Sequence, residues 1–271
     1  MILINKLILP PAEIASVWIE TGEKKANLPV SKMLFLGICA GIFIGFGAHA
    51  NIVVTQTLGN IDEGLAKLLG AAVFPVGLML VIMAGAELFT GNNLLTLALF
   101  DGRITFRKML TNWSVVYLGN FLGSIALALL LAASGIYGSE TMAAKAIGIA
   151  NGKVSGTFVQ AVLRGIVCNM LVVLACWMQA GARDMAGKIF AIWFPIMLFV
   201  LSGYEHSIAN MFFIPLGMFL GAEISWLQCW YNNLIPVTLG NIIGGAIIVP
   251  CVYYYCYKRD FAAAKGVQVN K

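Results

Sequence analysis

The sequence predicts an all-α polytopic membrane protein with six transmembrane helices, and three observations support this fold class. Of its 271 residues, 60% are hydrophobic and only 11% are charged, whereas soluble domains carry about 25% charged residues. The apolar residues gather in six segments, each long enough for the roughly 20 residues that a helical span needs. The first three segments and the last three carry similar polar motifs, which predicts two related halves.

The apolar segments define the expected domain organisation. They cover residues 32–57, 66–100, 109–134, 157–180, 187–220 and 232–257. We therefore expect one membrane domain over residues 32–257, with repeats at 32–134 and 157–257. Residues 1–31 are expected to form a cytoplasmic arm with a short amphipathic helix at the membrane surface, and residues 258–271 a cytoplasmic tail. The arm has no small-residue cleavage site, so it does not resemble a secretory signal peptide.

Basic residues in the loops predict the orientation. One set of loops holds only Lys67, Lys145 and Lys153, and the other set is rich in lysine and arginine. Because cytoplasmic loops carry the excess of positive charge, both termini are predicted to be cytoplasmic, which agrees with an even number of spans. The basic set comprises Lys6, Lys24, Lys25, Lys32, Arg103, Arg107, Lys108, Arg183, Lys188, Lys258, Arg259, Lys265 and Lys271. The net charge of +5 is thus scattered, and no nucleic-acid partner is expected.

The second and fifth segments are too long for a simple crossing, and both contain polar residues at mid-depth. The second contains GAELFTGNN (Gly85 to Asn93), and the fifth contains SGYEHSIAN (Ser202 to Asn210). An ionisable residue at the centre of a bilayer costs roughly 2.5 to 3.5 kcal/mol on insertion scales. Broken helices of this kind are tolerated only where they are buried in protein or line a cavity. Both helices are therefore predicted to be broken at a functional site, and transport of a polar solute is the favoured function.

The polar motifs predict an inverted repeat. Gly85-x-Glu87 followed by Asn92 matches Gly203-x-Glu205 followed by Asn210, and LGNFLG (Leu118 to Gly123) matches LGNIIG (Leu239 to Gly244). Each half has three spans, so the two copies must cross the membrane in opposite directions. Such repeats with broken helices point to a binding site near the midplane. Glycines at helical spacing allow close helix packing: Gly37, Gly41, Gly45, Gly119, Gly123, Gly240 and Gly244.

The motifs at the two breaks resemble those of the formate/nitrite transporter family, and they look most like those of formate channels. The resemblance rests on GAELFTGN, GYEHSIANM and NLIPVTLGNIIGG, and it extends to LPPAEIASVWIETGEKKA and DGRITFRKMLTNW. It implies an aquaporin-like six-span protomer in a homopentamer, with one pore per protomer, in a bacterial cytoplasmic (inner) membrane. The implied substrates are small monovalent anions: formate, nitrite, hydrosulfide and, in some members, lactate.

The resemblance also implies roles for individual residues. The residues matched to the pore are His206, Thr90, Lys153, Leu78, Leu88 and Phe199, with Lys153 expected on a short external loop. Glu205 and Asn169 match partners that position the histidine loop, and the repeat adds Asn210 and Glu87 to this group. The first span departs from formate channels at GFGAHANIVV, which brings in His49 and Asn51.

His206 suggests how an anion could pass a dry constriction. A bare charge is strongly disfavoured there, and His206 is the only pore-centre group with an intrinsic pKa near neutral, about 6.5. We hypothesise that it either donates a hydrogen bond to the anion or hands it a proton, with the Thr90 hydroxyl opposite. The residues leave both versions open.

Other functions find less support. Formate is the first choice of substrate, and nitrite or hydrosulfide follow. An aquaporin-type pore for neutral solutes would need NPA boxes at the breaks, and the sequence has none. An intramembrane hydrolase would need more than GKVSG (Gly152 to Gly156), so no catalytic residue and no enzyme activity are expected. A passive scaffold does not explain paired helix breaks.

No cofactor is expected. The only histidines, His49 and His206, have no ligand-spaced partners for a metal. The resemblance adds one possible macromolecular partner, a cytoplasmic formate-producing enzyme at the N-terminal helix predicted over Ala12 to Glu23.

Overall fold

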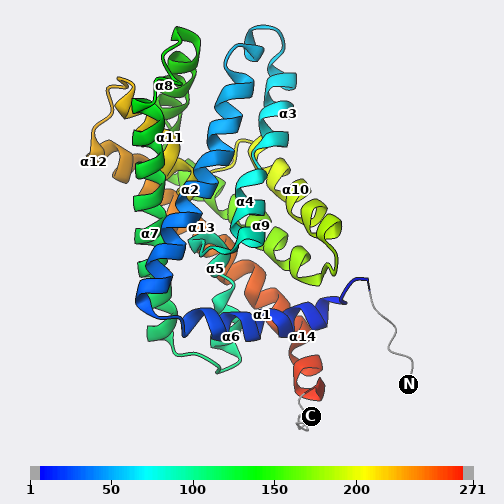
Figure 1. Ribbon diagram of the computed structural model, residues 1–271. Helices are drawn as coiled ribbons and strands as arrows, with labels where there is room; N and C mark the ends of the chain where they lie inside the picture. Colours follow the sequence, from blue (N-terminus) through cyan, green and yellow to red (C-terminus); the bar gives the residue numbers. More distant parts are fainter. Residues whose placement is uncertain (1–6, 265–271) are drawn as a thin grey trace.

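The computed structural model describes residues 7–264, and the side chains of residues 7–257 (Figure 1). The predicted tail, residues 258–271, therefore lies largely outside this range, as do the basic side chains predicted to orient the ends of the chain: Lys6, Lys258, Arg259, Lys265 and Lys271. Almost every described element is a helix. The one β contact in the described part is an isolated bridge between Ile8 and Ala182.

The first half runs from the N-terminal arm to the third long helix. Its elements are α1 (Pro11–Ala26), α2 (Val30–Thr55), η1 (Leu58–Asn60), α3 (Glu63–Val73), α4 (Val76–Leu80), η2 (Val81–Gly85), α5 (Phe89–Asn92), α6 (Leu95–Phe100) and α7 (Phe106–Ala133). Figure 1 shows α1 lying across one end of the bundle, next to α6 and α14. It begins at Pro11, whose ring is favourable in a first helical turn, and it buries Ile14, Trp18 and Ile19.

The second half repeats this order, with α8 before its first long helix as α1 is before α2. Its elements are α8 (Glu140–Val154), α9 (Phe158–Gly181), α10 (Met185–Leu201), α11 (Ser207–Phe219), α12 (Trp226–Gln228), η3 (Cys229–Leu234), α13 (Ile235–Ile242), η4 (Ile243–Ile248) and α14 (Val249–Ala264). The sequence did not predict α8. Lys153, expected on a short loop, lies instead in the last turn of this helix.

Within residues 7–264, five continuous helical stretches are long and apolar enough to cross a membrane. They are Val30–Asn60, Glu63–Gly85, Phe106–Ala133, Phe158–Gly181 and Trp226–Tyr257. The remaining predicted segment, 187–220, is divided into α10 and α11, which are apolar but shorter. The chain therefore has the predicted all-α architecture, and the second and fifth segments are broken as expected.

Both breaks have the same backbone course. Gly85 and Gly203 have φ values of +88° and +69°, in the left-handed region that a side chain disfavours. The chain then runs extended to Leu88 (φ −108°, ψ 122°) in the first half and to His206 (φ −111°, ψ 114°) in the second. A new helix begins directly after each of these two residues.

The inverted repeat is also visible in helix packing. In the first half α2 packs on α7, and in the second half α9 packs on α13 and η4. A Cβ atom at Gly123 would collide with the carbonyl oxygen of Ile38, and one at Gly244 would collide with that of Ile166. The predicted glycines therefore allow the backbones of the paired helices to touch. This close packing sets the position of the two breaks relative to each other.

Candidate functional site

Three cavities follow one another through the protomer. A cavity of about 600 Å³ lies beside α1, and one of about 160 Å³ lies beside α8. Between them is a chamber of about 10 Å³. This volume is at the lower limit for a single water, which needs at least about 10–15 Å³. We call these spaces the α1 cavity, the α8 cavity and the central chamber.

Apolar side chains separate the central chamber from both cavities. Leu78 and Leu88 line the chamber and the α1 cavity, so they form the wall between these two spaces. Phe74 and Phe199 line the chamber and the α8 cavity, and their rings pack edge to face with centroids 5.6 Å apart. The three apolar residues that the resemblance matched to the pore, Leu78, Leu88 and Phe199, thus line one chamber, and all three are buried.

His206 is the polar side chain of this central region. It lines both the chamber and the α8 cavity, and its ring packs against that of Phe199 at 5.8 Å between centroids. Its Nε2 atom lies 2.9 Å from Oγ1 of Thr90 across the junction of the two halves. Both side chains are buried, so the hydroxyl stands opposite the imidazole, as hypothesised.

The local hydrogen bonds determine the tautomer of the neutral imidazole. His206 precedes α11, and its Nδ1 accepts a hydrogen bond from the backbone N–H of Ala209 at 3.1 Å. A nitrogen that accepts in this way carries no hydrogen, so the ring hydrogen is on Nε2. Nε2 therefore donates to Oγ1 of Thr90. A proton added at Nδ1 would remove the bond to Ala209.

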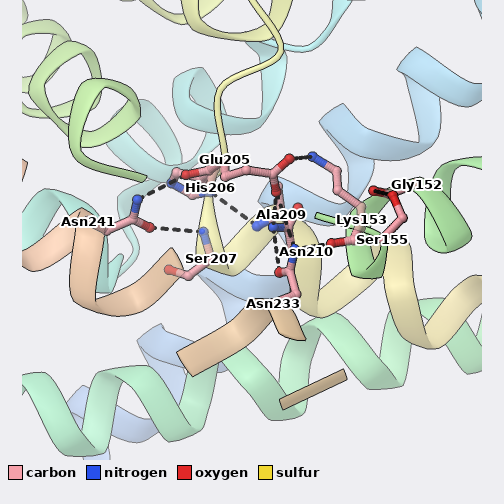
Figure 2. Close-up of polar contacts among 10 residues, drawn as sticks. All are labelled: Gly152, Lys153, Ser155, Glu205, His206, Ser207, Ala209, Asn210, Asn233 and Asn241. Carbon is pink, nitrogen blue, oxygen red and sulfur yellow. Dashed lines mark hydrogen bonds and ion pairs between the residues drawn. The ribbon is translucent and has the colours of Figure 1, made fainter. Parts of the chain in front are cut away.

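A polar cluster holds the second break in place (Figure 2). The Nζ of Lys153 lies 3.0 Å from Oε1 of Glu205, and Nδ2 of Asn210 donates to Oε2 of Glu205 at 2.6 Å. The same Nδ2 donates to Oδ1 of Asn233 at 2.8 Å, and Nδ2 of Asn233 donates to the carbonyl oxygen of Lys153 at 2.7 Å. The cluster thus fastens α8 to the residue that precedes His206.

The first break has an equivalent cluster with the same connections. The Nζ of Lys25 lies 2.7 Å from Oε1 of Glu87, and Nδ2 of Asn92 donates to Oε2 of Glu87 at 2.7 Å. Nδ2 of Asn92 also donates to Oδ1 of Asn112 at 2.9 Å, and Nδ2 of Asn112 donates to the carbonyl oxygen of Lys25 at 3.1 Å. Here the cluster fastens α1 to the residue that precedes Leu88.

One asparagine in each half binds the extended residues themselves. The side chain of Asn241 accepts from the N–H of Ser207 at 2.9 Å and donates to the carbonyl oxygen of Glu205 at 3.0 Å. Asn120 does the same in the first half, with the N–H of Phe89 at 2.9 Å and the carbonyl oxygen of Glu87 at 2.9 Å. These bonds satisfy backbone groups that the helix breaks leave unpaired.

Asn169 is positioned differently from what the resemblance implies. Its Nδ2 donates to the carbonyl oxygens of Asn241 and Thr90, at 2.8 and 3.3 Å, and to Oδ1 of Asn93 at 2.8 Å. Asn169 therefore contacts the Thr90 loop directly and reaches the histidine loop only through Asn241.

Sequence reasoning missed several of these residues, although some left a signal. Asn120 and Asn241 occupy the same place in the LGNFLG and LGNIIG motifs. Phe74 lies one helical turn before Leu78, which places both on one helix face. Lys25 had no such signal, because its pairing with Glu87 depends on how the arm packs.

His49, left without a role by the sequence, lies outside the three cavities. Its Nδ1 is 2.8 Å from the hydroxyl of Tyr137, in the connection that precedes α8. Burial raises the pKa of Tyr137 above its usual range, so the phenol keeps its hydrogen and can donate to the imidazole. The contact joins α2 to this connection. Asn51, in the same motif, lines the α8 cavity.

The charges at the two cavities differ. Each cavity has one lysine–glutamate pair in its wall or directly beside it, Lys25 with Glu87 and Lys153 with Glu205. The α1 cavity is also lined by Lys188, for which no ion pair is present in the described part of the chain. The α1 cavity therefore has an additional positive charge that the α8 cavity lacks.

Known proteins share this fold and these motifs. The family model described as "Formate/nitrite transporter" matches residues 12–255. A probable formate transporter of Methanothermobacter thermautotrophicus is 45% identical over 92% of this chain and 97% of its own. The formate channel BtFdhC of Bacillus thuringiensis is 40% identical, over 94% and 98%. The formate channel FocA of Escherichia coli K12 is 37% identical, over 93% and 96%.

Solved structures agree. A pentameric formate channel with formate bound has a TM-score of 0.76 and 35% identity, covering 84% of this chain and 98% of that one. An FNT family ion channel has a TM-score of 0.80 and 32% identity, covering 90% and 98%. The model match spans most of the sequence, and the relatives align over nearly their full length. The chain is therefore a multi-pass membrane protein that belongs to the formate/nitrite transporter family.

Proposed function

We propose that this chain is a channel for small monovalent anions, with formate as its substrate and the three cavities as its pore. The observation that carries the proposal is the contact between His206 and Thr90, at 2.9 Å, beside an apolar chamber of about 10 Å³. The walls of this chamber exclude hydrated ions, and the imidazole of His206, bonded to the Thr90 hydroxyl, is the polar side chain that lines it. The relatives named as formate transporters and channels support formate as the substrate.

The proposed orientation follows the loop charges. The basic loops support a cytoplasmic location for α1 and both termini, which would make the α1 cavity the cytoplasmic vestibule. The membrane proposed is a bacterial cytoplasmic membrane, as the resemblance to the family implies. The α8 cavity then faces the periplasm. The residue ranges predicted for the arm, the membrane domain and the tail belong to the same proposal.

The assembly we propose is a homopentamer with one pore in each protomer. A solved relative is described as a pentameric formate channel, and this supports the same state here. The protein is proposed to act without catalysing a reaction. A formate-producing enzyme binding to α1 would deliver substrate directly to the α1 cavity, which Trp18 and Lys25 line.

Flux measurements in proteoliposomes test the proposal. Formate, nitrite and hydrosulfide are offered at equal concentration, at pH 5 and pH 7, with current and internal pH recorded together. We expect formate flux to be the largest. A preference for nitrite or hydrosulfide would change the substrate and leave the pore in place, whereas no flux of any of them from folded protein would contradict the channel.

A His206→Ala variant separates the two versions of the mechanism. If His206 hands a proton to the solute, the pH dependence of formate flux should be lost in this variant. If His206 only donates a hydrogen bond, flux should fall at both pH values while its pH dependence stays. Thr90→Val is the matched variant, because it removes the hydroxyl opposite His206 and leaves the imidazole in place.

A further inference from the structure

Another cavity lies at the surface of the protomer and shares no lining residue with the three cavities of the proposed pore. Its volume is about 460 Å³, and it lies between α7 and α13. Leu110, Ile235 and Leu239 line it and are exposed. None of the described residues that line it is charged. We call this space the α7–α13 groove.

The groove lies on two helices that are able to span the membrane. Both α7 and the stretch Trp226–Tyr257, which contains α13, are long and apolar enough to do so. On α7 the lining residues begin at Leu110, four positions inside the helix, and the same helix face continues at Leu118 and Leu122, which are exposed. The groove is therefore continuous with the surface that this membrane protein presents to the bilayer.

The rim of the groove favours a lipid chain over a second copy of the protein as the occupant. Helix contacts in membranes are enriched in small residues, which allow two backbones to approach. On α7 such residues, Gly119 and Gly123, already face α2, whereas leucine and isoleucine form the rim of the groove. An empty hollow would forfeit the dispersion contacts of its wall. A flexible hydrocarbon chain can fill it, and the bilayer supplies one.

The polar atoms beside the groove leave little for a polar ligand to bind. The hydroxyl of Tyr117 on α7 lies 2.9 Å from Oγ1 of Thr238 on α13. Among the described residues this is the one hydrogen bond that joins the two helices, and it holds them at a fixed separation. Ser114, the other hydroxyl in the wall, can bond to a carbonyl oxygen of its own helix. The groove thus suits an alkyl chain and not a headgroup.

Phe89, a buried residue in the wall of the groove, connects it to the pore. It lies between Leu88, which lines the central chamber, and Thr90, which stands opposite the imidazole. Its ring packs edge to face on those of Trp113 and Tyr117, with centroids 6.0 and 5.0 Å apart. Phe89 begins α5, which has four residues and is too short to be stable by itself. The position of α5 therefore depends on what packs around Phe89.

We propose that the α7–α13 groove binds one hydrocarbon chain of a membrane phospholipid, and that this chain supports Phe89 and thereby the loop that carries Leu88 and Thr90. The site lies outside the pore, so the lipid influences transport without meeting the solute. Occupancy of the groove does not depend on what the protein transports. The effect on flux rests on the proposed transport of formate.

Fluorescence quenching tests occupancy without any transport. The protein is reconstituted in dioleoyl phosphatidylcholine, or in the same lipid brominated at its double bonds, because bromine quenches an indole that it touches. Trp113 lines the groove, and subtracting the emission of Trp113→Phe from that of the wild type isolates its signal. We expect most of this signal to be lost in the brominated bilayer. An unquenched Trp113 would overturn the proposal, because a second copy of the chain, the alternative occupant, carries no bromine.

Two variants of α7 assign the quenching to the groove, each measured with and without Trp113→Phe. Ser114→Leu adds bulk in the groove wall, and Thr111→Leu adds bulk one turn away, at a position that does not line the groove. Both positions are exposed, so neither change should prevent folding. Ser114→Leu should protect Trp113 from bromine, and Thr111→Leu should not. Equal quenching in the two variants would mean that lipid reaches Trp113 by another route, and it would contradict the groove.

A change of lipid tests the effect on transport. Diphytanoyl phosphatidylcholine has the same headgroup, but methyl branches widen its chains, so they should not enter the groove. Relative to dioleoyl phosphatidylcholine, we expect formate flux to fall by at least about fivefold in the wild type and in Thr111→Leu, the lower end for coupling between two sites. Ser114→Leu, whose own side chain fills the groove, should show no difference between the two bilayers.

The outcomes separate the lipid site from the proposed function. An equal fall in all three proteins would be a general effect of the bilayer and would refute the link through Phe89, and so would the absence of a fall in the wild type. No formate flux in either bilayer would refute the proposed function, whereas the quenching of Trp113 would still decide whether the groove holds a lipid chain.

Discussion

The two broken helices have the same scaffold but carry different chemistry. In both halves a lysine, a glutamate and two asparagines form one cluster, and a third asparagine binds the extended backbone. At the residue between that backbone and the new helix, the first half has Leu88 and the second has His206, with nearly equal φ and ψ values. The shared parts therefore build the pore, and a single position determines what each half presents to it.

The new helices also differ in length. The helix α11 continues for 13 residues after His206, whereas α5 has only four residues and is followed by a turn and α6. Because a macrodipole requires several aligned peptide units, α11 supplies more of the positive potential at the chamber than α5 does.

The largest effect is expected from removing the asparagines that bind the extended backbone. Asn241→Ala leaves the N–H of Ser207 and the carbonyl oxygen of Glu205 without partners, and Asn120→Ala does the same to Phe89 and Glu87. Each buried group left unpaired costs roughly 1–3 kcal/mol. We expect similar drops in thermal stability of the purified protein. A large drop for only one variant would show that the two scaffolds are not equivalent.

The lysine–glutamate pairs should come next. Lys25→Met leaves Glu87, whose side chain is 7% exposed, as a buried unpaired charge, and Lys153→Met does the same to Glu205 at 9%. Breaking a buried pair costs roughly 3–5 kcal/mol, which partial exposure of the lysines reduces here. In the double variant Lys25→Met/Glu87→Gln, thermal stability should largely return. No recovery would indicate that Lys25 acts through packing and not through charge.

A substitution at the differing position should affect transport more than stability. His206→Leu gives the second half the residue of the first, and it removes a helix cap with a typical value of about 1 kcal/mol. Formate flux should fall by at least about tenfold, since a buried hydrogen bond to Thr90 is lost as well. The control, Leu88→Met, keeps volume and apolarity and should stay within about twofold of wild-type flux. Equal flux in the two variants would contradict a special role for His206.

The smallest effect is expected from removing the positive charge of Lys188 in the wall of the α1 cavity. Lys188→Met should leave stability unchanged and raise the half-saturating formate concentration from the α1 side about two- to threefold at low salt. The change should shrink at high salt, because ions screen exposed charges. Arg183→Met, on the same side but outside the cavity, is the control. An effect that persists at high salt would indicate direct binding in place of attraction at a distance.

The sequence was sufficient to predict the breaks, because GAELFTGNN and SGYEHSIAN place polar residues at membrane depth. It was also sufficient to predict the repeat, and the resemblance carried by these motifs implied the position of Thr90 opposite His206. It failed for α8, where lysine, glycine and alanine mix without a clear apolar face. It also missed the pairing of Lys25 with Glu87, since 62 residues separate them and only the packing of α1 brings them together.

The asymmetry between Leu88 and His206 has a consequence for how such a pore can arise. Two identical half-length chains, paired head to tail, would place the same residue at both positions. Such a pore would have two imidazoles at its centre or none. Joining the halves in one polypeptide lets each copy change alone, so that one imidazole faces one hydroxyl at 2.9 Å. A single imidazole at the narrowest point therefore requires two halves that differ in sequence, which a symmetric pair of identical chains does not provide.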